Sequence, residues 1–135
     1  MEFYQLKITR KGTKPPVWRR CLIPADTNFR KMAEMLQDIL EYQSTDLYEI
    51  EFFQKKVRIC NMTAQETDTA KGNYEYLEAK DTKTSELLDT EAWFTFRVKE
   101  SDLPEYRADI EKKVEDAEIK TSDGVKKASA PVILK

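Results

Sequence analysis

The residues best suited to chemistry lie between Arg10 and Arg20, where an aromatic side chain stands among fixed positive charges. The candidate binding residues of this segment are Arg10, Lys11, Lys14, Trp18, Arg19 and Arg20. A tryptophan ring can stack on nucleic-acid bases, and guanidinium groups can pair with phosphates through two parallel hydrogen bonds. The segment therefore suggests a nucleic-acid contact.

A structural role for Trp18 is the alternative, and we favour it. Successive side chains of a β-strand point to opposite faces. Trp18 and Leu22 would then pack in the core, while Arg20 covers apolar surface with its stem and keeps its charged head in water. Arg19 would point the other way, beside Cys21. The acidic isoelectric point, near 5.4, also argues against a dedicated nucleic-acid binder.

Groups for catalysis or metal binding are sparse elsewhere. The chain has no histidine, which removes the commonest general base and the commonest zinc ligand. Glu49 and Glu51 would share one face of a strand, where their oxygens could hold a hard cation. Asp102, Glu105 and Asp109 are close in sequence and could do the same. We favour a solvated acidic face in both places, and predict no catalytic residue, metal site or cofactor.

Composition predicts a single domain over residues 1–135. With 40% hydrophobic residues, a chain of this length buries roughly two-thirds of the surface that it exposes when unfolded. Residues 1–31 contain eight Lys or Arg against Glu2 and Asp26, so they carry a net charge of +6 and the rest of the chain carries −8. No apolar run approaches the roughly 20 residues of a membrane span, and no secretory signal pattern is present. We therefore expect a cytoplasmic protein with reduced cysteines.

A hairpin is predicted to hold the basic segment. Apolar and more polar residues alternate over 3–10 and again over 17–23, which predicts two strands. Between them, Gly12 and two prolines predict a turn over 11–16. The basic residues would therefore lie in this turn and at the adjoining strand ends.

A helix and a second hairpin should follow. Apolar residues recur every three or four positions and predict an amphipathic helix over 28–42, with Asp26 and Thr27 offering capping oxygens. Alternation over 47–52 and an apolar run over 57–62 predict two paired strands across a short turn.

The next elements complete the predicted fold. A polar loop is expected over 63–73, residues 74–79 are ambiguous, a helical turn is expected over 85–88 and a strong strand over 91–99. We predict an α+β fold in which one main helix packs on an antiparallel or mixed sheet of β-grasp-like order. The predicted core consists of Tyr4, Leu6, Ile8, Trp18, Leu22, Phe29, Met32, Leu36, Ile39, Leu40, Tyr48, Ile50, Phe52, Phe94, Phe96 and Val98.

The segment from about residue 100 onward gives two conflicting signals. Ile110, Val114 and Ala117 have the spacing of an amphipathic helix within 102–120, and the Glu- and Lys-rich composition favours that helix. Ile110 and Val114 also fit the alternation of an edge strand. The apolar run at 131–134 would need a partner to be buried.

One family shares the pattern of the first forty residues. Tyr4-Gln5-Leu6-Lys7-Ile8-Thr9, Gly12, Pro15-Pro16-Val17-Trp18-Arg19-Arg20 and Pro24-Ala25-Asp26-Thr27 together resemble the plasmid pRi ORF-three-like family, whose small proteins recur in plasmids and mobile elements. The family typically reads His-Leu-His where this chain has Asp46-Leu47-Tyr48, and its Gly-Asp-x-Trp-x-His stretch is absent near 96–109. Similarity of Asp109-Ile110-Glu111 and Asp123-Gly124 to the end of the family pattern implies a strand over 109–115. The resemblance implies no defined biochemical role.

Three classes of function stay open at this point. The leading hypothesis is a non-enzymatic binding or adaptor domain that contacts a protein, or a second copy of itself, through a sheet edge. Nucleic-acid binding through the basic hairpin is the first alternative, and a small carboxylate-dependent metal enzyme is the second.

Overall fold

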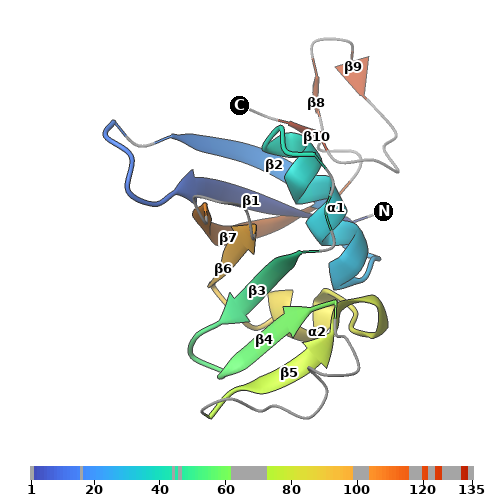
Figure 1. Ribbon diagram of the computed structural model, residues 1–135. Helices are drawn as coiled ribbons and strands as arrows, with labels where there is room; N and C mark the ends of the chain where they lie inside the picture. The colour runs from blue at the N-terminus through green and yellow to red at the C-terminus, as the bar shows by residue number, and fades with distance from the viewer. Residues whose placement is uncertain are drawn as a thin grey trace.

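The computed structural model shows a chain dominated by β-strands (Figure 1). It describes residues 2–15, 17–43, 45, 47–61, 73–98 and 104–115, together with the backbone of 120–121, 124–125 and 132–133. The longer strands are β1 (Glu2–Arg10), β2 (Trp18–Pro24), β3 (Tyr48–Phe52), β4 (Val57–Cys60), β5 (Glu75–Glu78), β6 (Trp93–Val98) and β7 (Glu105–Glu115). The remaining elements are β8 (Lys120–Thr121), β9 (Gly124–Val125), β10 (Val132–Ile133), helices α1 (Phe29–Ile39) and α2 (Ser85–Leu88), and the 3-10 turn η1 (Ala79–Asp81).

Eight strands form one sheet, in the order β10-β2-β1-β7-β6-β3-β4-β5. Neighbouring strands run antiparallel except β4 and β5, which are parallel. Strand β7 lies near the middle of the sheet, with β1 on one side and β6 on the other. Strands β8 and β9 form a separate two-stranded ribbon.

The predicted α+β class with β-grasp-like order is wrong, because the molecule is mostly sheet. Among the described residues, α1 is the only helix longer than four residues. The predicted order fails because β1 pairs with β7, a strand in the segment where a helix was expected. The hairpins predicted over 3–23 and 47–62 and the strand over 91–99 are confirmed by β1–β2, β3–β4 and β6.

Strand β7 is the longest of the described strands, although its Glu and Lys residues favour a helix. Tyr106 and Ala108 point into the main core, and the backbone on both sides of β7 pairs with a neighbouring strand. Helix propensities differ by only about 0.7 kcal/mol per ordinary residue, so pairing and burial outweigh them here. The strand that the family resemblance implied over 109–115 is therefore the correct alternative.

Helix α1 is shorter than predicted and has a different N-cap. The Oδ1 atom of Asn28 accepts a hydrogen bond from the Lys31 backbone N–H at 2.9 Å, so the cap is neither Asp26 nor Thr27. At the other end, the N–H groups of Glu41 and Tyr42 donate to carbonyls of the last turn. Glu41 has a φ of 65°, the left-handed conformation that usually selects glycine after a helix.

The main core lies between α1 and one side of the sheet. Of the sixteen predicted core residues, fourteen are buried, and Trp18 and Leu40 are only partly buried. Leu22 belongs to a small second cluster with Phe3 and Val114 on the opposite side of the sheet. The strand alternation was therefore predicted correctly for β2, but Trp18 and Leu22 do not face the main core.

The segments with weak sequence signals, 63–79 and 131–134, are only partly described by the structure. Most of the loop predicted over 63–73 lies outside the described residues, whereas β5 occupies the ambiguous stretch 74–79. Strand β10 gives the apolar tail a partner, because Val132 and Ile133 pair with β2. Within the described part of the chain, no helix has the length and apolar character needed to cross a membrane.

Candidate binding face of the sheet

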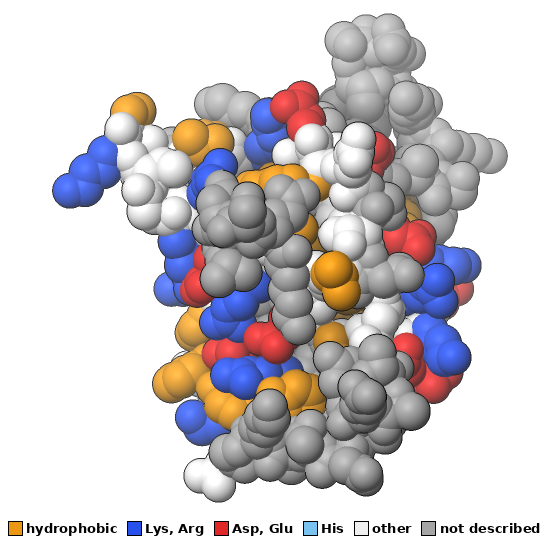
Figure 2. Space-filling view, viewed as in Figure 1, with side chains coloured by type: hydrophobic (Ala, Val, Ile, Leu, Met, Phe, Trp, Pro, Cys, Tyr) orange, Lys and Arg blue, Asp and Glu red, His pale blue; other side chains and the backbone are white. Residues whose placement is uncertain are grey.

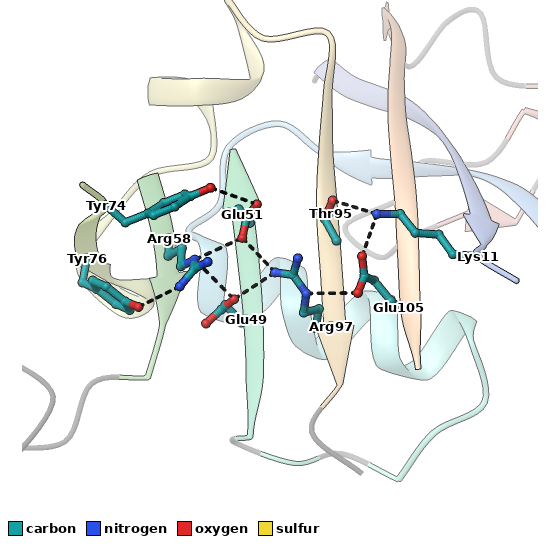
Figure 3. A network of polar contacts seen from close by, with 9 residues as sticks. All are labelled: Lys11, Glu49, Glu51, Arg58, Tyr74, Tyr76, Thr95, Arg97 and Glu105. Atoms are coloured by element: carbon teal, nitrogen blue, oxygen red, sulfur yellow. Dashed lines mark hydrogen bonds and ion pairs between the residues drawn. The ribbon is translucent and has the colours of Figure 1, made fainter. Parts of the chain in front are cut away.

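The sheet side opposite α1 carries a row of polar and aromatic side chains, here called the outer face. Alternation along each strand determines it, because the residues next to a buried residue in the same strand point away from the main core. Its side chains include Gln5, Lys7, Thr9, Trp18, Arg20, Glu49, Glu51, Arg58, Trp93, Thr95, Arg97, Arg107, Asp109 and Glu111. Figure 3 shows part of this face, with charged side chains in front of the strands and α1 behind them.

The structure divides the six predicted binding residues between two sides of the sheet. Trp18 and Arg20 lie on the outer face, whereas Arg19 alternates with them and lies on the helix side. Arg10 also lines a hollow of about 280 Å³ on the helix side, beside Arg19. Lys14 is exposed in the loop between β1 and β2. The six residues therefore do not form one continuous basic patch.

The hollow on the helix side is formed where β1 and β2 approach the end of α1. Leu40 and Tyr42 line it together with Tyr106, and the two tyrosine hydroxyls are 2.6 Å apart. Arg19 has its Nη2 atom 3.9 Å from a carboxylate oxygen of Glu41, whose side chain is highly exposed. Such an exposed pair contributes little to stability.

Trp18 is partly exposed and lies beneath two cations. The Nζ atom of Lys7 is 4.9 Å from the ring centroid, and the guanidinium carbon of Arg20 is 5.3 Å from it. Both distances are within the range of a cation–π attraction. The core position predicted for Trp18 is wrong, since the side chain forms part of the polar outer face.

Arg20 is held by a carboxylate from β7. Its Nε and Nη2 atoms donate to the two oxygens of Glu111 at 2.7 and 3.0 Å, and Gln5 donates to the same carboxylate at 2.9 Å. The hydrogen bond from Arg20 is the main reason that the pKa of Glu111 lies below its usual range. The bidentate geometry fixes Arg20 on the face.

A charged ladder continues across the strands (Figure 3). It consists of Lys11, Glu105, Arg97, Glu49, Glu51 and Arg58. Lys11 donates from Nζ to Glu105 at 2.7 Å, and this bond lowers the pKa of Glu105. The other oxygen of Glu105 accepts a hydrogen bond from Arg97 at 3.3 Å. The Lys11 ammonium group is therefore paired with a carboxylate of β7, that of Glu105.

Glu51 is the most buried charge of the ladder, with 6% of the residue exposed. Arg97 donates to it at 3.0 Å and to Glu49 at 2.9 Å, while Arg58 donates to Glu51 at 3.0 Å and to the Tyr76 hydroxyl at 3.0 Å. Burial alone would raise the pKa of Glu51, but Arg97 and Arg58 outweigh it and keep the pKa below the usual range. A carboxylate so enclosed is charged and has no capacity to act as a proton donor near neutral pH.

The shared strand face predicted for Glu49 and Glu51 is therefore confirmed, but it is paired rather than solvated. In the described ranges of the chain, no group of three or more acidic or cysteine side chains could hold a metal ion. Asp102 lies outside those ranges, and Glu105 and Asp109 have cationic partners in Lys11 and Arg107.

Sequence reasoning missed a second tryptophan on this face. Trp93 is partly exposed, and the guanidinium carbon of Arg107 lies 4.6 Å from its ring centroid. Arg107 also donates to Asp109 at 3.0 Å. Phe94 and Phe96 were predicted to be buried in one strand. Because side chains alternate along a strand, that prediction already implies that Trp93 points to the opposite face.

Of the two positions where the resembled family has histidines, the second, Tyr48, has a structural role in this chain. Asp46 lies outside the described residues, Leu47 is exposed and Tyr48 is buried. The hydroxyl of Tyr48 donates to Oδ1 of Asn61 at 2.9 Å, which connects the start of β3 to the end of β4.

Comparison with known proteins supports both the fold and the family. The chain has no match among curated proteins. Its fold is similar to the crystal structure of a protein of unknown function, MM3350, from Methanosarcina mazei Go1, with a TM-score of 0.67 and 20% sequence identity. That similarity covers 89% of this chain and 66% of the archaeal one, so the chain spans slightly less than two thirds of that protein. The model of the plasmid pRiA4b ORF-3-like proteins matches residues 2–130, and the chain is therefore a member of this family.

Proposed function

We propose that this chain is a non-enzymatic module that recognises a protein partner through its outer face. The observation that carries the proposal is the partial exposure of Trp18 and Trp93 beside arginines on the side of the sheet opposite α1. Tryptophan, tyrosine and arginine are the residues most enriched at the energetic centres of protein interfaces. A rigid sheet presents such side chains in fixed positions, which lowers the entropy lost on binding.

The pairing of the charges favours a protein over nucleic acid. Arg20, Lys11 and Arg107 each have a carboxylate partner, so these cations do not form an open field for phosphates. Figure 2 likewise shows Lys and Arg side chains interspersed with Asp and Glu side chains on the visible side of the molecule. Nonspecific binding to nucleic acid depends on many uncompensated positive charges. Nucleic-acid binding by the hairpin therefore remains the second candidate.

The module is proposed to act as one domain in the cytoplasm. The buried Cys21 and Cys60 are free thiols, which suits a reducing compartment. Membership of the family does not imply a specific reaction for this chain, and a binding module does not require one.

Affinity capture from the native host, followed by quantitative mass spectrometry, tests the proposal. The tagged wild-type chain is compared with the variant Trp18→Ala/Trp93→Ala, which removes both aromatic anchors. We expect a stoichiometric partner to be lost from this variant. Sedimentation velocity of the purified chain serves the same test if the partner is a second copy.

The matched control is Arg30→Ala/Glu34→Ala, which removes an exposed ion pair from the solvent side of α1. It should retain the partner, and circular dichroism should show that all variants are folded. Equal capture by the outer-face variant and the control would refute the proposal. Salt-sensitive binding of labelled DNA or RNA between about 50 and 200 mM salt, in the absence of any captured protein, would favour the second candidate.

A further inference from the structure

We propose that one end of the outer face recognises an extended acidic peptide segment of the partner. This region, the cationic corner, is formed by Lys7, Trp18, Arg20 and Lys112. The inference rests on the proposed function, because it names the chemistry of the partner that the outer face would bind.

The first support is an imbalance of charge. Across β2, β1 and β7, the carboxylates of Glu105, Asp109 and Glu111 all have cationic partners within 3.0 Å. Lys7 and Lys112, in contrast, make no ion pair within 4.0 Å in the described part of the chain, although Lys7 lies near enough to Glu111 to help lower the pKa of that carboxyl. The cationic corner therefore has positive charge left over after its internal pairs are made, and a partner with carboxylates complements it.

The spacing of the two lysines suits an extended chain. A β-bulge in β7 places Glu111 and Lys112 together opposite Gln5 of β1, and Lys7 lies two residues further along β1 on the same face. Two residues along a strand span about 7 Å, and neighbouring strands lie about 4.8 Å apart, so the two backbone positions are separated by about 8 Å. Carboxylates at alternate positions of an extended peptide are about 7 Å apart and match this separation.

Trp18 supplies a third contact in the same row. Arg20 pairs across the strands with Lys7, and Trp18 lies two residues from Arg20 on the same face. An extended ligand with an aromatic residue followed at alternate positions by two acidic residues would place the aromatic ring near Trp18 and the carboxylates near Lys7 and Lys112. The bond between Arg20 and Glu111 keeps the intervening guanidinium in a fixed position.

The small size of the charge surplus favours a peptide over an oligonucleotide. Lys7 and Lys112 could together neutralise two anionic groups, whereas tight phosphate-driven binding uses about 6–10 contacts. The acidic peptide is therefore the occupant that the outer face fits best.

Fluorescence anisotropy with synthetic peptides tests the inference directly. The probe is a fluorescein-labelled peptide in which phenylalanine, glutamate and glutamate occupy alternate positions, separated by serines. It is compared with a version carrying glutamine for glutamate, with a version that places the phenylalanine on the opposite face from the glutamates, and with a single-stranded oligonucleotide. We expect the acidic peptide to bind at least about tenfold more tightly than each of these.

Protein variants then locate the site. Lys7→Ala/Lys112→Ala should weaken the acidic peptide at least about tenfold, and Lys7→Arg/Lys112→Arg should retain most of the affinity. The control Lys31→Ala/Lys80→Ala removes two lysines near the start of α1 and should leave the affinity unchanged. Equal affinity for the glutamine peptide, tighter binding of the oligonucleotide, or no binding of the acidic peptide at about 1 mM would each overturn the inference. If capture of a native partner still depended on Trp18 and Trp93, the proposed function would survive that failure.

Discussion

Replacing Arg97 by alanine is expected to destabilise the fold more than replacing any other arginine of the outer face. Arg97 donates hydrogen bonds to three carboxylates, those of Glu49, Glu51 and Glu105, at 2.9, 3.0 and 3.3 Å. Glu51 is 6% exposed, so water cannot fully replace the lost partner.

The expected loss lies between two limits. Removing one partner of a fully buried ion pair costs about 3–5 kcal/mol, and removing one from an exposed pair costs about 1 kcal/mol or less. After the change, Arg58 would still contact Glu51 at 3.0 Å, and Lys11 would still contact Glu105 at 2.7 Å. We therefore expect Arg97→Ala to lower the free energy of unfolding by about 2–3 kcal/mol. For a domain of this size, that loss corresponds to a decrease in Tm of about 6–15 °C.

Urea denaturation followed by circular dichroism measures the effect, with Arg107→Ala as the matched control. Arg107 is also an arginine of the outer face, but its pair with Asp109 is exposed and should be worth less than about 1 kcal/mol. A Glu51→Gln/Arg97→Met variant should lose less stability than Glu51→Gln and Arg97→Met lose together, because the two residues contact each other directly and their shared ion pair is lost only once. The reasoning would be refuted if Arg97→Ala and Arg107→Ala lost the same stability within about 0.5 kcal/mol, or if the double variant were additive.

Three further predictions follow from the described contacts. Because the pKa of Glu51 is lower in the folded state, its contribution to stability is complete above the unfolded pKa near 4.3 and is lost as pH falls through the folded value. Urea titrations from about pH 7 to 3 should show this decline, which should be smaller in Arg97→Ala because the loss of Arg97 brings the folded pKa of Glu51 closer to the unfolded one. Glu41→Gly should raise the unfolding free energy by up to about 1 kcal/mol, since glycine adopts the φ of 65° without strain and the exposed Arg19 contact is weak; a lower Tm would contradict this. Phe96→Ala should cost about 3–5 kcal/mol in the same denaturation assay, whereas an unchanged Tm would show that Phe96 is not a core residue.

The sequence predicted elements whose partners are close along the chain. The β1–β2 and β3–β4 hairpins and α1 could be found from alternation, turn residues and helical spacing. The prediction from sequence failed for β7, because this strand pairs with β1 and β6. Part of that pairing is distant along the chain and cannot be detected from the residues next to β7 in sequence. Helix propensity was then the only remaining signal, and it pointed the wrong way.

The candidate site was predictable only in part for the same reason. Alternation correctly placed Trp18 and Arg19 on opposite sides of β2, but it could not say which side faces the main core. The pair formed by Arg97 and Glu51 joins residues 46 positions apart and requires the register of β3 and β6. Glutamates that looked solvated in the sequence are thus enclosed by arginines from neighbouring strands.

The central position of β7 also determines when the sheet can form during synthesis of the chain on the ribosome. Strand β1 leaves the ribosome first, yet its second neighbour, residues 105–115, is made about a hundred residues later. Until then β1 and β6 each present an unpaired edge, the kind of surface that associates with other nascent chains. Truncation before β7 would leave both edges open permanently. The last long strand among the described residues therefore joins the two halves of the sheet, and folding should depend on the synthesis of β7 rather than on the early hairpin.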